Sequence, residues 1–123
     1  MTGALTWAGV ALLGAGGAWA RFVVGSAIAA RRPGAFPFGT FAVNLSGGFL
    51  LGLLTGLSVT GDALLLLGTG MLGAYTTFST WMVEAQRLGE DGAFGAMWLY
   101  LFGSMVAGLA VTGAGWLLGG ALG

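Results

Sequence analysis

The sequence has no cysteine, no histidine and few charges, since only 7% of its 123 residues are Asp, Glu, Lys or Arg. Without cysteine there is no disulfide or thiol chemistry, and without cysteine and histidine the common zinc sites are excluded. The acidic residues form no carboxylate pair deep in an apolar stretch, so the groups of an intramembrane enzyme are missing as well. We therefore expect no enzymatic activity and no nucleic-acid partner.

Apolar residues dominate what remains. They make up 57% of the chain, and the mean hydropathy is +0.94. This composition excludes a soluble globular domain and makes the lipid bilayer the expected surroundings. A helix needs about 20 residues to cross the hydrocarbon core, and four stretches are long enough, at about 5–29, 38–59, 63–88 and 93–118. The sequence predicts an all-α integral membrane protein whose single domain, 1–123, contains four transmembrane helices.

Glycine is abundant, with 26 occurrences. In the second predicted span Gly48, Gly52 and Gly56 recur every four residues, which places them on one face of a helix. Small residues at this spacing let two helix backbones approach closely in a membrane. We interpret this ridge as a packing surface.

Polar residues form two further stripes. One face of the second span carries Thr40, Asn44 and Gly47, and the fourth span carries Tyr100, Ser104, Gly108 and Thr112 at intervals of four. Polar groups inside a membrane are costly unless they are bonded or functional. The residues leave two interpretations of Asn44 open, a hydrogen-bond clamp between helices and a donor to a permeating solute.

The centre of the third predicted span is the least lipid-like part of the chain. It reads GAYTTFSTW at residues 73–81 and combines glycines with hydroxyl side chains that compete for backbone hydrogen bonds. We expect the helix to break near 73–77. A broken helix exposes carbonyls that can bind a small hard cation such as Na⁺, whereas the simpler alternative is a kink that binds no ion.

Three blocks of the sequence carry a family resemblance. They are GAYTTFSTW with the following Glu84, FGTFAVNLSGGFLLG at 38–52, and GAWAR at 17–21. Together they resemble the signature blocks of the Fluc/CrcB fluoride channel family. The resemblance implies a passive, fluoride-selective channel in the cell's inner membrane that exports F⁻ and relieves its toxicity. It also implies an antiparallel, dual-topology dimer with a structural Na⁺ at its centre and two narrow pores.

The resemblance carries over to individual residues. The backbone carbonyls of Gly73 and Thr76 correspond to the Na⁺ ligands. Asn44, Phe78 and Trp81 correspond to the pore residues, although the family usually has Phe where this chain has Trp81. The hydroxyl groups expected along the pore are those of Thr40, Tyr100, Ser104 and Thr112.

Two charged residues lie within the predicted spans. Arg21 either extends its head group to the membrane interface or pairs with a carboxylate, and Glu84 is the candidate partner. We interpret both as residues that stabilise the vestibule of the pore. A small multidrug-type exporter is an alternative built from similar dimers, but it needs a carboxylate in the first span, and none occurs between Met1 and Ala30.

The charges of the connecting segments bear on orientation. Arg31, Arg32 and Arg87 fall on one side of the predicted bundle, and Asp62 falls on the other. Positive residues favour the cytoplasmic side, whereas a subunit that inserts in both directions should show little bias. The sequence therefore leaves open a homodimer of dual topology and one subunit of a heterodimeric fluoride channel, and we expect the homodimer because one chain carries all the motifs.

Overall fold

The computed structural model describes residues 3–123, and this part of the chain is helical apart from short connections. In chain order the elements are α1 (Gly3–Arg31), α2 (Phe38–Gly56), α3 (Gly61–Leu64), the π-helix η1 (Leu65–Leu72), α4 (Gly73–Tyr75), α5 (Ser79–Glu90) and α6 (Phe94–Leu122). Among the described residues, α1, α2 and α6 are the helices that are long and apolar enough to cross a membrane. The third predicted span is divided among α3, η1, α4 and α5.

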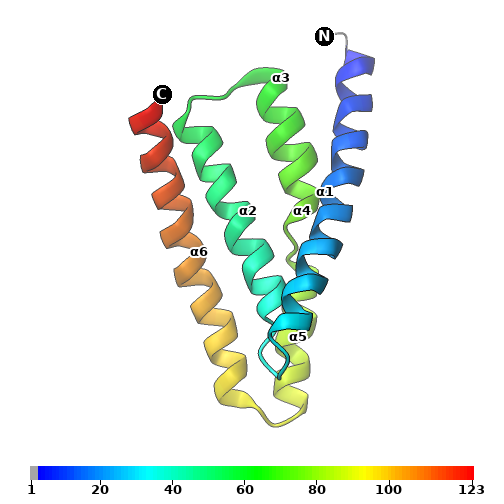
Figure 1. Ribbon diagram of the computed structural model, residues 1–123, viewed down its shortest axis with the longest axis vertical. Coiled ribbons are helices and arrows are strands. Elements are labelled where there is room, and N and C mark those ends of the chain that lie inside the picture. The colour runs from blue at the N-terminus through cyan, green and yellow to red at the C-terminus, as the bar shows by residue number, and fades with distance from the viewer. Residues whose placement is uncertain (1–2) are drawn as a thin grey trace.

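The elements run up and down in two adjacent pairs (Figure 1). Helix α2 packs most extensively against α6, and α1 packs against η1 and α4. Figure 1 shows both ends of the chain at one end of the molecule, and the α1–α2 and α5–α6 connections at the opposite end. Gly34 in the first connection has φ +136°, a conformation that favours glycine, so the chain reverses direction there.

Helix α2 ends at Gly56, earlier than the predicted end near residue 59. Ser58 adopts φ 63°, a left-handed conformation that cannot continue a right-handed helix. The Ser58 amide still donates to the Thr55 carbonyl at 3.0 Å. The next helix, α3, begins at Gly61.

The glycine ridge of α2 is confirmed as a packing surface. A Cβ atom at Gly52 would meet the Thr112 carbonyl of α6, and one at Gly56 would meet the Trp116 carbonyl. Gly115 of α6 approaches the Phe49 carbonyl in the same way. Backbone therefore lies directly against backbone along this pair of helices, which requires the absence of side chains on both.

Helix α1 supports the unusual third segment in a similar way. A Cβ atom at Gly17 would meet the Met71 carbonyl of η1, and one at Gly14 would lie 3.5 Å from the Gly70 carbonyl. Gly70 itself is buried. A π-helix is rare and often marks a functional position, and here its glycines let α1 cover it closely.

Few side chains of the described residues are fully buried. The main buried cluster consists of Ala85, Leu88 and Tyr100, near the end that holds the α5–α6 connection. Large apolar side chains on α1 and α6, such as Leu12 and Leu109, are each 75% exposed. This outward apolar surface is what a lipid-facing bundle requires.

Candidate functional site

The candidate site is built around an interruption between α4 and α5. Helical structure stops at Tyr75 and begins again at Ser79, and Thr76 is extended, with φ −79° and ψ 159°. The Thr76 amide and its side-chain hydroxyl both donate to the Leu72 carbonyl, at 3.0 and 3.1 Å. The hydroxyl thus closes the last turn before the chain leaves the helix, a role for which threonine is well suited.

Asn44 of α2 bonds to the interrupted backbone with both ends of its side-chain amide. Its Nδ2 donates to the Thr77 carbonyl at 2.9 Å, and its Oδ1 accepts from the Thr77 amide at 2.8 Å. A side-chain amide offers the same donor and acceptor as a peptide group. The Asn44 side chain therefore takes the place of the backbone groups to which the Thr77 amide and carbonyl would bond in a regular helix.

The interruption redirects two backbone amides away from helical carbonyls. In a continuous α-helix the Thr77 amide would donate to the Gly73 carbonyl and the Thr80 amide to the Thr76 carbonyl. The Thr77 amide instead donates to Asn44, and the Thr80 amide donates to the Thr77 hydroxyl at 3.3 Å. Gly73 and Thr76 are thus among the residues around the interruption whose carbonyls lose their usual helical donors.

Three of the predicted pore hydroxyl and amide residues share one cavity with Trp81. This donor cavity, of about 380 Å³, lies between α2, α5 and α6. Its lining residues are Asn44, Trp81, Ser104, Met105, Gly108, Leu109 and Thr112. The two predicted polar stripes therefore meet at Asn44, and the lining contains no charged side chain.

A second cavity adjoins the interruption. This break cavity, of about 320 Å³, shares Asn44 and Trp81 with the donor cavity, and Gly73, Thr76 and Phe78 also line it. Phe78 is 69% exposed, and its ring meets that of Trp81 edge-on, with 5.6 Å between centroids and 69° between planes. The predicted cation ligands and both pore aromatics thus lie around one hollow.

Thr40 of α2 and Arg21 of α1 line a different cavity, on the side of α2 that faces α1. They line an arginine cavity of about 320 Å³ together with Ser26, Thr77 and Thr80. Thr40 is therefore separated from the donor cavity, although it lies one helical turn from Asn44. Arg21 therefore shares the arginine cavity with hydroxyl side chains, and Glu84 is not among the residues that line it.

The partner of Glu84 is Tyr100, not the predicted Arg21. The Tyr100 hydroxyl donates to Glu84 Oε1 at 3.2 Å. Tyr100 has no exposed surface, and its ring meets Phe36 edge-on at 5.4 Å. Tyr100 thus lies outside the donor cavity because it fills the buried cluster at the end of the bundle.

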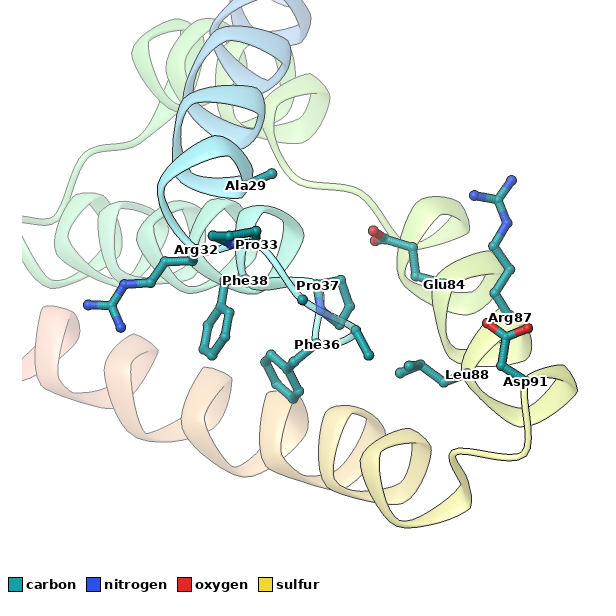
Figure 2. Close-up of a pocket in the computed structure, with 12 residues that line it drawn as sticks. Ala29, Arg32, Pro33, Phe36, Pro37, Phe38, Glu84, Arg87, Leu88 and Asp91 are labelled. Carbon is teal, nitrogen blue, oxygen red and sulfur yellow. The ribbon is translucent and has the colours of Figure 1, made fainter.

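Glu84 borders a further cavity at this end, of about 330 Å³, between α5 and the α1–α2 connection. Figure 2 shows Glu84 and Leu88 extending from α5 toward the connection, with Arg87 pointing away from it. Arg32 lies over the Phe38 ring, with 6.0 Å from its guanidinium carbon to the centroid. Arg87 and Asp91 also line this end cavity, so it is bordered by charged side chains of both signs.

Sequence reasoning missed the partners that hold the interruption in place. In the sequence, Thr77 is one of several neighbouring hydroxyl residues. In the structure its peptide group, rather than its hydroxyl, bonds to Asn44. The Tyr75 hydroxyl also lies 2.9 Å from the Ser46 hydroxyl of α2. The hydroxyl residues that follow Gly73 indicated where the helix is interrupted. They did not indicate which residues of α2 bond to the interruption.

Comparison with known proteins gives the family. Residues 8–116 match the family described as CrcB-like protein, Camphor Resistance (CrcB). The chain belongs to the CrcB family. This CrcB protein is 51% identical over 112 residues to "Fluoride-specific ion channel FluC 2" of Mycolicibacterium paratuberculosis, a match covering 91% of this chain and 92% of the relative.

Further relatives match over most of their length. A "Fluoride-specific ion channel FluC 2" of Moorella thermoacetica is 41% identical over 121 residues, covering 96% of this CrcB chain and 99% of the relative. The corresponding channel of Mycobacterium tuberculosis (strain H37Rv) is 50% identical over 106 residues, 86% of this chain and 84% of the relative. The interruption, the donor cavity and the glycine ridge all lie inside the matched region 8–116.

Replacing Asn44 tests the bonds that hold the interruption. Asn44→Leu leaves the amide and carbonyl of Thr77 without their partner, and an unsatisfied buried group costs about 1–3 kcal/mol. Hydrogen exchange at the Thr77 amide should accelerate about 10- to 100-fold. Thr55→Val is the matched control, because the Thr55 hydroxyl donates to the Leu51 and Gly52 carbonyls of its own helix α2. Equally slow exchange in Asn44→Leu and the parent would contradict this role.

Proposed function

We propose that this CrcB protein is a fluoride-selective channel subunit through which F⁻ crosses the membrane passively. The observation that carries the proposal is the donor cavity, where amide, hydroxyl and indole donors surround a hollow without a fixed charge. The relatives named fluoride-specific ion channels support it. A channel of this kind has no catalytic residues.

The chemistry of the cavity suits fluoride. Fluoride is a small, strongly hydrated anion, so donors must replace the water that it loses on entering. Asn44, Ser104 and Thr112 offer N–H and O–H groups, and aromatic ring edges at Phe78 and Trp81 offer a positive rim. Several weak neutral contacts in series let an ion enter and also leave, as conduction requires.

The residues at the end of the bundle form the approach to this path. The Tyr100 hydroxyl is hydrogen-bonded to the Glu84 carboxylate, which borders the end cavity, and the Thr40 hydroxyl borders the arginine cavity. An arriving anion can accept hydrogen bonds from these hydroxyls. Arg21 contributes positive charge to the adjoining cavity and stabilises the vestibule.

A structural Na⁺ fits the carbonyls of the interruption. Na⁺ binds oxygen ligands, and the carbonyls of Gly73 and Thr76 have their usual helical donors redirected to side chains. When bound, the ion would raise the local potential for an anion. The chain's own contribution is to keep these carbonyls out of helical bonds, through Asn44 and Thr77.

An antiparallel dimer would complete the site. Irregular backbone survives within a bilayer only where protein covers it or where it lines a cavity. The break cavity borders the exposed Phe78, so a second copy packed there would shield the interruption from lipid. Two copies would bring four carbonyls to a shared Na⁺ and give two narrow pores.

The proposed direction of transport is outward across the inner membrane. Fluoride that enters the cell as HF is deprotonated inside, and a potential that is negative inside favours its exit by about 2.3 kcal/mol per 100 mV. No further energy source is needed. The protein would thereby relieve fluoride toxicity.

Fluoride efflux from liposomes tests the proposal. Purified protein should release F⁻, measured with a fluoride electrode, while internal Cl⁻ is retained. Asn44→Asp loses the donor and adds a like charge, and Phe78→Ile loses the ring edge, so both should abolish most of the efflux. Thr55→Val should match the parent. Release of Cl⁻ as fast as F⁻, or release of neither ion, would contradict the proposal.

Removal of sodium tests the cation site. Exhaustive exchange of Na⁺ for N-methylglucamine should slow fluoride efflux strongly, and added Na⁺ should restore it, since the carbonyls are proposed to need the ion. Thr76→Ser keeps the carbonyl and the hydroxyl that bonds to Leu72, so it should respond to Na⁺ as the parent does. Fluoride efflux that is undiminished without Na⁺ would contradict the proposed Na⁺ site.

Topology labelling tests the self-dimer. The chain has no cysteine, so Asp91→Cys in the α5–α6 connection introduces a unique thiol. With this chain expressed alone, an impermeant thiol reagent should label about half of the molecules on intact cells. Uniform protection together with absent fluoride flux would instead require a second, differently encoded subunit.

A further inference from the structure

Tyr75, the last residue of α4, is attached to α2 by a short chain of hydrogen bonds. Helix α4 lies beside α2 (Figure 1). The Ser46 hydroxyl donates to the Val43 carbonyl at 3.0 Å, and its oxygen lies 2.9 Å from the Tyr75 hydroxyl. A serine hydroxyl has one hydrogen to donate, so the Tyr75 hydroxyl is the donor to Ser46. Tyr75 is thereby tied through Ser46 to the backbone of α2.

The Tyr75 ring and the next residue, Thr76, are both seated on Gly47 of the same helix. A Cβ atom at Gly47 would lie 3.1 Å from Cδ2 of the Tyr75 ring and would meet the Thr76 methyl carbon. Gly47 is buried, as this close approach requires. The end of α4 therefore rests directly on the surface of α2.

Three residues of one turn of α2 contact three consecutive residues of the third segment. The pairs are Ser46 with Tyr75, Gly47 with Thr76, and Asn44 with Thr77. At about 100° per residue, the three α2 residues follow one another around the helix in this order.

Thr76, the middle of the three consecutive residues, is where the backbone leaves the helix, with ψ 159°. The Thr76 carbonyl and the Thr77 amide belong to one planar peptide group, so the bond from that amide to Asn44 fixes its far side. The bond between Tyr75 and Ser46 fixes the chain on its near side. The Thr76 carbonyl is therefore held from both directions by α2.

We propose that Tyr75 is a positioning residue whose bond to Ser46 sets the Na⁺ affinity of the interruption through the Thr76 carbonyl. The inference rests on the proposed Na⁺ site and names a residue that acts on it through the backbone of its neighbour. A carbonyl that is already in place loses little freedom when the ion binds, so a pinned site binds more tightly than a loose one. Within a bilayer no bulk water competes for the Tyr75 hydroxyl, which favours its bond to Ser46.

Removal of the Tyr75 hydroxyl tests the inference without depending on transport. Tyr75→Phe keeps the ring on Gly47 and deletes the donor. Ion binding opposes the local opening that hydrogen exchange requires, so Na⁺ should protect the Thr77 amide, followed by NMR in lipid nanodiscs. The Na⁺ concentration for half-protection should rise about 3- to 20-fold in Tyr75→Phe, which is the effect of losing one hydrogen bond in a membrane protein.

Variants of Ser46 test whether the bond itself is responsible. Ser46→Ala should raise the half-protecting Na⁺ concentration as Tyr75→Phe does, and the double variant should add little, because each change deletes the same bond. Ser46→Thr keeps the hydroxyl and should behave as the parent does. Thr55→Val removes a hydroxyl that donates within α2 and should leave the Na⁺ dependence unchanged.

Fluoride efflux measured against Na⁺ separates positioning from a general loss of packing. Tyr75→Phe should need about 3- to 20-fold more Na⁺ for half-maximal efflux and should approach the parent's rate when Na⁺ saturates. A lower maximal efflux at an unchanged half-maximal Na⁺ concentration would overturn the inference, since Tyr75 would then serve packing alone.

The remaining outcomes distinguish this inference from the proposed function. If Na⁺ protects Thr77 equally well in the parent and in Tyr75→Phe, the inference is overturned, and the Na⁺ site and the channel stand. If Na⁺ has no effect on Thr77 exchange in the parent, the Na⁺ site and the inference fail together. A parent that responds to Na⁺ but releases no fluoride overturns the channel function alone.

Discussion

The structure depends on one constraint, which is that backbone amides and carbonyls inside a bilayer must be bonded within the protein. Helices α1, α2 and α6 meet it with their own helical bonds. The third segment does not, because it leaves the helix after Tyr75. The Asn44 amide satisfies the exposed peptide group of Thr77, so a single side chain on α2 allows irregular backbone to exist where regular helix would otherwise be required.

The position of α2 follows from this constraint. One face of the helix is bare glycine and lies directly on the backbone of α6. Elsewhere on the helix, Asn44 bonds to the interruption, and the Ser46 hydroxyl lies 2.9 Å from the Tyr75 hydroxyl. Close approach to α6 also brings Ser104 and Thr112 into the cavity that Asn44 lines. The same glycines that make packing tight therefore set the width of the proposed fluoride path.

The sequence predicted features that depend on local pattern. Apolar length and the proline and glycine turns predicted the helices, and the four-residue spacing of Gly52 and Gly56 predicted their packing face. Hydroxyl residues after a glycine indicated where helical bonding would weaken. Each of these signals acts within a few turns of one helix, so periodicity is enough to detect it.

Features that depend on which helices meet could not be predicted in this way. Thr40 and Asn44 share a helical stripe, but α1 and α6 approach α2 from different sides, so the two residues line different cavities. Tyr100 continues the stripe of Ser104, yet the fold needs its ring in the buried cluster and its hydroxyl at Glu84. Helical spacing predicts the face of the helix on which a residue lies, but it does not predict which residue of another helix that residue contacts.

Electrical recording tests the central claim most directly, because the account says that the cavities around Asn44 form a pathway for fluoride alone. Purified protein in a planar bilayer, with fluoride on one side and chloride on the other in sodium-containing solution, should carry a current only in the direction of fluoride movement. Its reversal potential should follow the fluoride gradient and ignore the chloride gradient. A current that reverses near zero under these conditions, or no current at all, would contradict the account.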